Sequence, residues 1–108
     1  MAAKPRKLST ESLGRTIEKL MAETGLTYRA LAEKTSLSAG YLNHIVHGNR
    51  PVPSNEVLAR LAKALGVKPE HFREFRIRFI TDKLEKMPEL VDRLYNRLSR
   101  SRQSPSRR

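Results

Sequence analysis

Residues 31–50, LAEKTSLSAGYLNHIVHGNR, decide how this chain folds. They contain two short amphipathic helix patterns about four residues apart, and the second pattern opens at Ser38 and stops at Gly48. A serine accepts a hydrogen bond from the free N–H groups at a helix start, and glycine readily adopts the left-handed backbone that ends many helices. This spacing suits a helix-turn-helix, in which two helices pack at a steep angle across a tight turn.

Small and apolar side chains inside and beside this stretch fit that packing. Ala30 and Ala32 allow the two helices to approach closely, and Leu37 fills the corner of the turn. Leu42 and Ile45 lie on one face of the second helix and tie it to a core. The opposite face of the second helix is therefore expected to be exposed and rigidly presented.

Helix patterns continue on both sides of these two helices. The expected cap residues are Ser9 or Thr10, Thr27, Ser38 and Ser54, and the expected stops are Gly25, Gly48 and Gly66. A fifth helix is predicted from about Pro69 to Lys86, and Pro88 is expected to start a sixth. No segment alternates with period two, so the prediction is an all-α protein.

The charge of the chain favours a polyanionic partner. Its 108 residues hold 22 Lys and Arg against 11 acids, a net charge of +11. Residues 8–99 account for only 15 of the bases and all 11 acids, so most of the excess lies on the two ends. Such ends bind phosphates with little sequence preference and strong salt dependence, although they are also typical of tails that only keep a protein in solution.

Several classes of site and location are not expected. The chain has no cysteine, and no apolar run approaches the ~18 residues of a membrane span. The basic N-terminus is not followed by the apolar stretch of a secretory signal, so we expect a cytoplasmic, nucleoid-associated protein. His44 and His47 stand three residues apart, but no carboxylate lies near them in sequence. No metal, cofactor, small-molecule ligand or catalytic arrangement is predicted, and the chain is not expected to be an enzyme.

Taken together, the motifs resemble the lambda-repressor-like family of phage repressors and their bacterial relatives, the XRE type. The resemblance covers roughly residues 12–74 and rests on Leu31-Ala32-Glu33-Lys34, Leu37-Ser38, Tyr41-Leu42, Ile45, Gly48, Pro53-Ser54 and Leu61-Ala62-Lys63-Ala64-Leu65-Gly66-Val67. It implies a five-helix bundle that binds double-stranded operator DNA, usually as a dimer, followed here by an extra C-terminal helix. This chain departs from the family pattern at Ser36, where glycine is usual, and at Val46, where glutamate is usual.

The resemblance also implies which residues meet DNA. The family's base-reading positions fall on Ala39, Gly40, Asn43 and His44. An asparagine amide pairs in bidentate fashion with adenine, and a histidine can donate to a guanine acceptor. The small Ala39 and Gly40 allow the helix to lie deep in the groove. The alternative is that Asn43 and His44 belong to an ordinary solvated helix face.

Contacts to the DNA backbone are expected at both ends of the helix pair and on the two chain ends. The candidates next to the helices are Thr27, Tyr28, Arg29, Tyr41, His47, Asn49 and Arg50, although a half-buried core role suits Tyr41 equally well. The candidates on the arm and tail are Lys4, Arg6, Lys7, Arg100 and Arg102. A diffuse phosphate contact is favoured over insertion of the arm into a groove.

Residues 70–98 extend beyond the five-helix pattern. Phe72, Phe75 and Phe79 are expected along one edge of the fifth helix, and a helical hairpin formed by the fifth and sixth helices is predicted to supply a homodimer interface. The interface candidates are Ile80, Leu84, Leu90, Val91, Leu94, Tyr95 and Leu98. The alternatives are a hairpin that caps its own domain and a sixth helix that lies on an anionic membrane.

The predicted organisation has four parts: a flexible basic arm at 1–8, a DNA-binding domain at 9–75, a helical extension at 76–98 and a disordered basic tail at 99–108. The predicted function is a sequence-specific regulator of transcription, most simply a repressor that binds a two-fold operator as a dimer. One alternative is a nucleoid-type protein that binds DNA broadly. The other is an interaction module, an antitoxin or a polymerase-docking factor, acting through residues 70–98.

Overall fold

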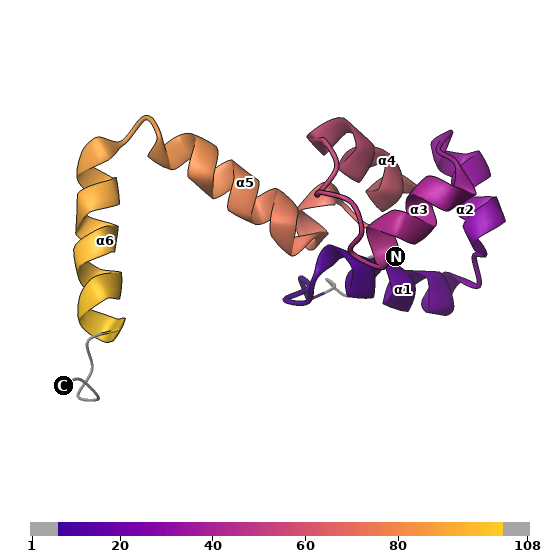
Figure 1. Cartoon of the computed structure of the whole chain (residues 1–108), viewed down its shortest axis with the longest axis horizontal. Coiled ribbons are helices and arrows are strands. Elements are labelled where there is room, and N and C mark those ends of the chain that lie inside the picture. Colours follow the sequence, from indigo (N-terminus) through magenta and orange to yellow (C-terminus); the bar gives the residue numbers. More distant parts are fainter. Residues whose placement is uncertain (1–6, 103–108) are drawn as a thin grey trace, which may run out of the picture. The chain divides into compact units, whose positions relative to one another are not determined.

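The computed structural model describes residues 7–102, and every element in that range is helical, which confirms the all-α prediction (Figure 1). The elements are α1 (Leu13–Thr24), α2 (Tyr28–Thr35), α3 (Ala39–Val46), α4 (Asn55–Leu65), a 3-10 helix η1 (Pro69–His71), α5 (Arg73–Leu84) and α6 (Pro88–Arg102). They divide into two compact units, Met1–Ile77 and Arg78–Arg108. No helix in the described range is long and apolar enough to cross a bilayer.

The segment before α1 is fastened to the first unit by two arginines of α5. The guanidinium of Arg76 donates to the carbonyl oxygen of Ser9 at 2.7 Å, and that of Arg73 donates to the carbonyl oxygen of Thr10 at 3.2 Å. Each bond joins residues more than 60 positions apart in the chain. The start of the domain and the start of α5 therefore hold one another in place.

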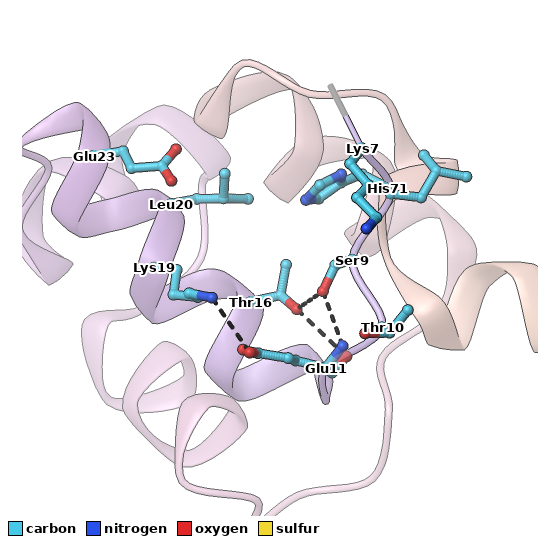
Figure 2. A pocket seen from close by; sticks show the side chains of 10 residues that line it. Lys7, Ser9, Thr10, Glu11, Thr16, Lys19, Leu20, Glu23 and His71 are labelled. Carbon is cyan, nitrogen blue, oxygen red and sulfur yellow. Dashed lines mark hydrogen bonds and ion pairs between the residues drawn. The ribbon is translucent and has the colours of Figure 1, made fainter. Parts of the chain in front are cut away.

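Figure 2 shows the pocket of about 310 Å³ that this segment forms with α1. The pocket is lined by Lys7, Leu8, Ser9, Thr10, Glu11, Thr16, Lys19, Leu20, Glu23 and His71. The hydroxyl groups of Ser9 and Thr16 lie 2.6 Å apart, and the ammonium of Lys19 lies 3.3 Å from a carboxylate oxygen of Glu11. These two contacts join the segment before α1 to α1 itself.

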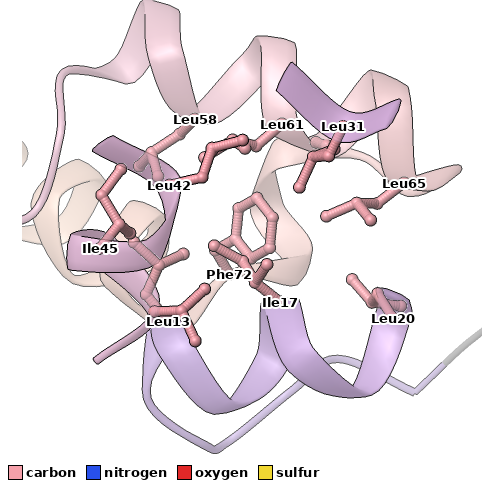
Figure 3. Close-up of a cluster of buried hydrophobic side chains, with 12 residues drawn as sticks. Leu13, Ile17, Leu20, Leu31, Leu42, Ile45, Leu58, Leu61, Leu65 and Phe72 are labelled. Carbon is pink, nitrogen blue, oxygen red and sulfur yellow. The ribbon is translucent and has the colours of Figure 1, made fainter. Parts of the chain in front are cut away.

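A single apolar core holds the helices of the first unit together (Figure 3). Its members are Leu13, Ile17 and Leu20 from α1, Leu31 from α2, Leu42, Ile45 and Val46 from α3, Leu58, Leu61, Ala62 and Leu65 from α4, and Phe72. The aromatic ring of Phe72 lies among side chains of all four helices and is completely buried. Burial of a large apolar side chain is worth roughly 1.5–3 kcal/mol, so this core is the main source of stability.

Three of the four predicted helix caps are present. The hydroxyl oxygens of Thr27, Ser38 and Ser54 accept hydrogen bonds from the N–H groups of Ala30, Tyr41 and Val57, respectively. The prediction for the first helix is wrong, because α1 begins at Leu13 and neither Ser9 nor Thr10 caps it. A carboxylate oxygen of Glu74 accepts from the Leu13 N–H at 3.0 Å instead.

The predicted fifth helix from about Pro69 to Lys86 is not continuous, and α5 ends at Leu84. It is interrupted at Phe72, whose backbone is extended (φ −81°, ψ 127°), so that η1 precedes the break and α5 follows it. Phe72 consequently leaves the edge that it was expected to share with Phe75 and Phe79 and enters the core. Phe79 is 54% exposed.

The turn between α2 and α3 forms without glycine. Ser36 adopts the left-handed conformation (φ 60°, ψ 33°), and its N–H group donates to the Ala32 carbonyl. The backbone of Leu37 donates to the same carbonyl, and its side chain packs against the core as expected. A positive φ is strained for a residue other than glycine, and the two hydrogen bonds to the Ala32 carbonyl offset this strain at Ser36.

Helix α1 touches the backbone of α3 at a single glycine. A Cβ atom built on Gly14 would lie 2.1 Å from the carbonyl oxygen of Val46, a distance far inside van der Waals contact. Gly14 is buried, and α1 and α3 are among the most closely associated elements of the first unit. The absence of a side chain at Gly14 is therefore what permits α3 to pack this close to α1.

The second unit contains the end of α5 and all of α6. Helix α6 continues to Arg102, so residues 99–102, expected to belong to a disordered tail, are helical. The end of α5 and α6 do not pack along one another, and the expected helical hairpin is not formed in the described residues. Of the interface candidates, Leu84, Leu90 and Leu94 are half-buried, and Ile80, Val91, Tyr95 and Leu98 are exposed.

Candidate nucleic-acid interface

The outer face of α3 is formed by Gly40, Asn43, His44 and His47, all of which are exposed. Their spacing of three, four and seven residues places them on one side of a helix. The opposite side of α3 is buried through its contribution to the core. This outer face, as defined by these four residues, is held on a rigid support.

Two side chains of the outer face can read bases. In the part of the chain that the structure describes, the side chains of Asn43 and His44 form no hydrogen bond with the protein, so their donors and acceptors are available to a ligand. The other two predicted base-reading positions are Ala39 and Gly40. Ala39 is the first residue of α3, and both are exposed. The structure thus brings Ala39, Gly40, Asn43 and His44 together on the first two turns of one helix.

The end of α3 carries two positioned groups. The Nδ1 atom of His47 lies 2.8 Å from the carbonyl oxygen of Asn43. A carbonyl can only accept, so Nδ1 carries the proton and Nε2 is the ring atom left for another partner. The guanidinium of Arg50 lies 5.9 Å from the centre of the Tyr41 ring, a cation–π contact that orients this cation beside α3.

Tyr41 is half-buried against the core, as one of the two roles considered for it requires, and its ring also contacts Arg50. Asn49 is exposed in the loop that follows α3. Its N–H group donates to the His44 carbonyl at 2.8 Å. The loop therefore leaves α3 along a defined path, with Asn49 and Arg50 at its start.

The start of α2 presents hydrogen-bond donors. Thr27 uses its hydroxyl as the cap of α2, and Arg29 is exposed in the first turn. Burial raises the pKa of the Tyr28 hydroxyl above 10.0, and the negative charge of Glu18 raises it further. Tyr28 is therefore protonated at neutral pH and able to donate to a phosphate, as are the first N–H groups of the helix.

The predicted arm and tail contacts fall partly outside the described residues, where Lys4, Arg6 and the side chain of Arg102 lie. Lys7 is exposed at the beginning of the fastened segment. Arg100 is exposed on α6, in the second unit. Within the described range, no group of three or more histidines and carboxylates is arranged to hold a metal ion.

Basic residues also gather beside the turn between α2 and α3, at a place that the sequence pattern does not predict. A pocket of about 550 Å³ beside the turn is lined by Lys34, Thr35, Ser36, Arg60, Lys63 and Ala64. Arg60 donates to the Thr35 carbonyl at 3.3 Å and pairs with Glu56 at 3.1 Å. The three cations come from α2 and α4, so only the packing of these helices brings them together.

A family model described as a helix-turn-helix domain matches residues 12–75, more than half of the chain. The chain belongs to this family. The helix-turn-helix consists of α2, the turn at Ser36 and α3. In DNA-binding proteins with this motif, the second of the two helices enters the major groove.

Two known proteins resemble this helix-turn-helix chain. Multiprotein-bridging factor 1 of Eremothecium gossypii is 37% identical over 65 residues, which are 60% of this chain and 41% of that protein. The chain thus matches less than half the length of that relative. A solved SinR protein/SinI protein complex contains a chain that superimposes with a TM-score of 0.50 and 22% identity, covering 81% of this chain and 98% of the other.

The SinR likeness concerns the fold and agrees with the all-helical architecture. With the family match it confirms the resemblance to lambda-repressor-like helix-turn-helix proteins. The family match therefore indicates a DNA-binding regulator of transcription.

Proposed function

We propose that this helix-turn-helix protein is a sequence-specific repressor that lays the outer face of α3 in the major groove of a two-fold operator. One observation carries the proposal. Helix α3 is buried in the core on one side, and on its other side it exposes the polar side chains of Asn43 and His44. Such a face can discriminate base edges because the core fixes the helix that carries these side chains, while their polar groups stay available to the bases. Repression follows if the occupied operator overlaps the site that polymerase needs.

Phosphate contacts complete the docking. The first N–H groups of α2, together with Tyr28 and Arg29, suit one phosphate, and Arg50, oriented by Tyr41, suits another. These contacts fix the register of α3 on the duplex but carry no sequence information. With two well-equipped base readers, the remaining selectivity would come from the shape of the DNA and from the spacing of two half-sites.

The double substitution Asn43→Ala with His44→Ala tests base reading. We expect affinity for an operator selected from random duplexes to fall by at least roughly 30-fold, since two base contacts are lost and each costs about 1–3 kcal/mol. Affinity for unrelated duplex should change less than about twofold, because phosphate contacts dominate it. Fluorescence anisotropy at several salt concentrations measures both.

Asn96→Ala, which removes an exposed amide from α6, is the matched control and should leave both affinities unchanged. Equal loss of operator and unrelated binding in the double variant, or no loss in either, would favour the nucleoid-type protein over the repressor.

The two-fold part of the proposal rests on α6. Val91, Tyr95 and Leu98 are 40%, 70% and 61% exposed, an apolar face that would be covered by the same face of a second copy. Each protomer would then place one α3 in the major groove, with half-sites about 10 base pairs apart or a multiple of that distance. The location proposed for such a repressor is the cytoplasm, on the nucleoid.

Light scattering after size exclusion tests the dimer. The full chain is expected to have twice the mass of one chain, and the pair Val91→Glu with Leu98→Glu should halve it. Asn96→Glu, on the other side of α6, should not. A full chain that is already monomeric at micromolar concentration would remove the dimer from the proposal.

A second candidate function is supported by the names of the two similar proteins. One is called a multiprotein-bridging factor and the other is in a complex with SinI protein. In this alternative, the chain is an antitoxin or a polymerase-docking factor. Residues 70–98 would bind the toxin or the polymerase, and the helix-turn-helix would support them. Failure of the full chain to bind any duplex at low salt would favour this function.

A further inference from the structure

The five glycines of this chain differ in whether the fold explains them. Gly25, Gly48 and Gly66 have positive φ values of 73°, 75° and 79°, a conformation that other residues rarely adopt. Gly14 has no room for a Cβ atom against the Val46 carbonyl. Each of these four positions favours glycine for a reason that lies inside the protein.

Gly40 has no such reason. It lies in the first turn of α3 with ordinary helical backbone, and a Cβ atom built there would meet nothing within 4 Å. Glycine destabilises a helix relative to alanine, because its unfolded chain has more freedom to lose. The free protein would therefore be more stable with almost any other helix former at this position.

The position of Gly40 on α3 indicates why a side chain is absent there. It lies on the outer face, three and four residues before Asn43 and His44. Its chain neighbour Ala39 carries only a methyl group. At Ala39 and Gly40 the first turn of α3 therefore offers only backbone and one methyl group, while the next turn carries the two side chains that can reach base edges.

We infer that Gly40 is the point at which the backbone of α3 comes closest to the DNA, and that the duplex fills the space a side chain would occupy. This inference rests on the proposed function. In the complex, the helix would enter the groove with its first turn deepest, as recognition helices do when their N-terminal residues contact base edges. Gly40 then determines specificity, because only at this depth do the short side chains of Asn43 and His44 reach the bases.

Two substitutions of increasing size test the inference. Gly40→Ala should raise the Tm of the full chain by roughly 2–5 °C. It should weaken binding to the selected operator about tenfold, and Gly40→Leu should weaken it 100-fold or more. Binding to unrelated duplex, which need not enter the groove as deeply, should change less than threefold in both variants.

Ala22→Leu, at an exposed position near the end of α1, adds comparable bulk elsewhere and should alter no DNA affinity. A selected operator that Gly40→Ala and Gly40→Leu bind as tightly as the native chain would overturn the inference and leave the proposed function standing. A lower Tm for Gly40→Ala would also overturn it, because the glycine would then be required by the fold. If the native chain selects no operator at all, the proposed function fails and the inference fails with it.

Discussion

Replacement of Gly14 by alanine is expected to lower the free energy of unfolding by about 3 kcal/mol, the upper part of the range for overpacking a core. The added methyl carbon would lie 2.1 Å from the carbonyl oxygen of Val46. This oxygen belongs to the backbone of α3, so no side-chain rotation can relieve the clash. Relief requires α1 and α3 to separate, which would loosen the core on both sides of the contact.

Thermal unfolding followed by circular dichroism measures this effect, with an expected fall in Tm of roughly 10–20 °C. Gly40→Ala is the matched control, because the same chemical change is made at a helical glycine with open space around it. The two variants should shift Tm in opposite directions. An unchanged Tm for Gly14→Ala would mean that α1 and α3 are not packed as described.

Replacement of Phe72 by alanine is expected to lower the free energy of unfolding by about 3–5 kcal/mol. The ring is 0% exposed and lies among core side chains of α1, α2, α3 and α4 (Figure 3). Its removal leaves a cavity that the four helices cannot close without shifting. Because α3 loses part of its support, operator affinity should fall along with stability.

Phe79→Ala provides the comparison, since the same side chain is removed from a position 54% exposed on α5. There the ring has a cation–π contact with Lys83 at 5.4 Å, which is worth no more than about 1 kcal/mol at an exposed site. Urea titration of both variants should separate their unfolding free energies by at least about 2 kcal/mol. Similar values for the two would contradict the assignment of Phe72 to the core and Phe79 to the surface.

Local chemistry explains what could be predicted of the fold. Thr27, Ser38 and Ser54 each act on N–H groups three residues away, so a short window of sequence contains both partners. The start of α1 was mispredicted because its cap, Glu74, is 61 residues distant. The break at Phe72 was missed for a similar reason: burial of the ring in a distant core outweighs continuation of the helix.

The same division applies to the candidate site. Periodicity is enough to place Asn43 and His44 opposite Leu42 and Ile45, and the structure has them on opposite sides of α3. The approach of α1 at Gly14 depends on tertiary packing. Only the three-dimensional structure separates Gly14, which the fold needs, from Gly40, which the fold does not need.

Site-directed cleavage of DNA can show whether the outer face of α3 lies in the major groove of a specific operator. Because the chain has no cysteine, His47→Cys creates a single attachment point for an iron chelate at the end of this face. We expect cleavage confined to the major groove of each half-site of the selected operator, whereas Ala22→Cys, labelled in the same way, should give none there. Cleavage spread evenly along the duplex, or the same pattern from His47→Cys and Ala22→Cys, would mean that α3 does not lie in the major groove as proposed.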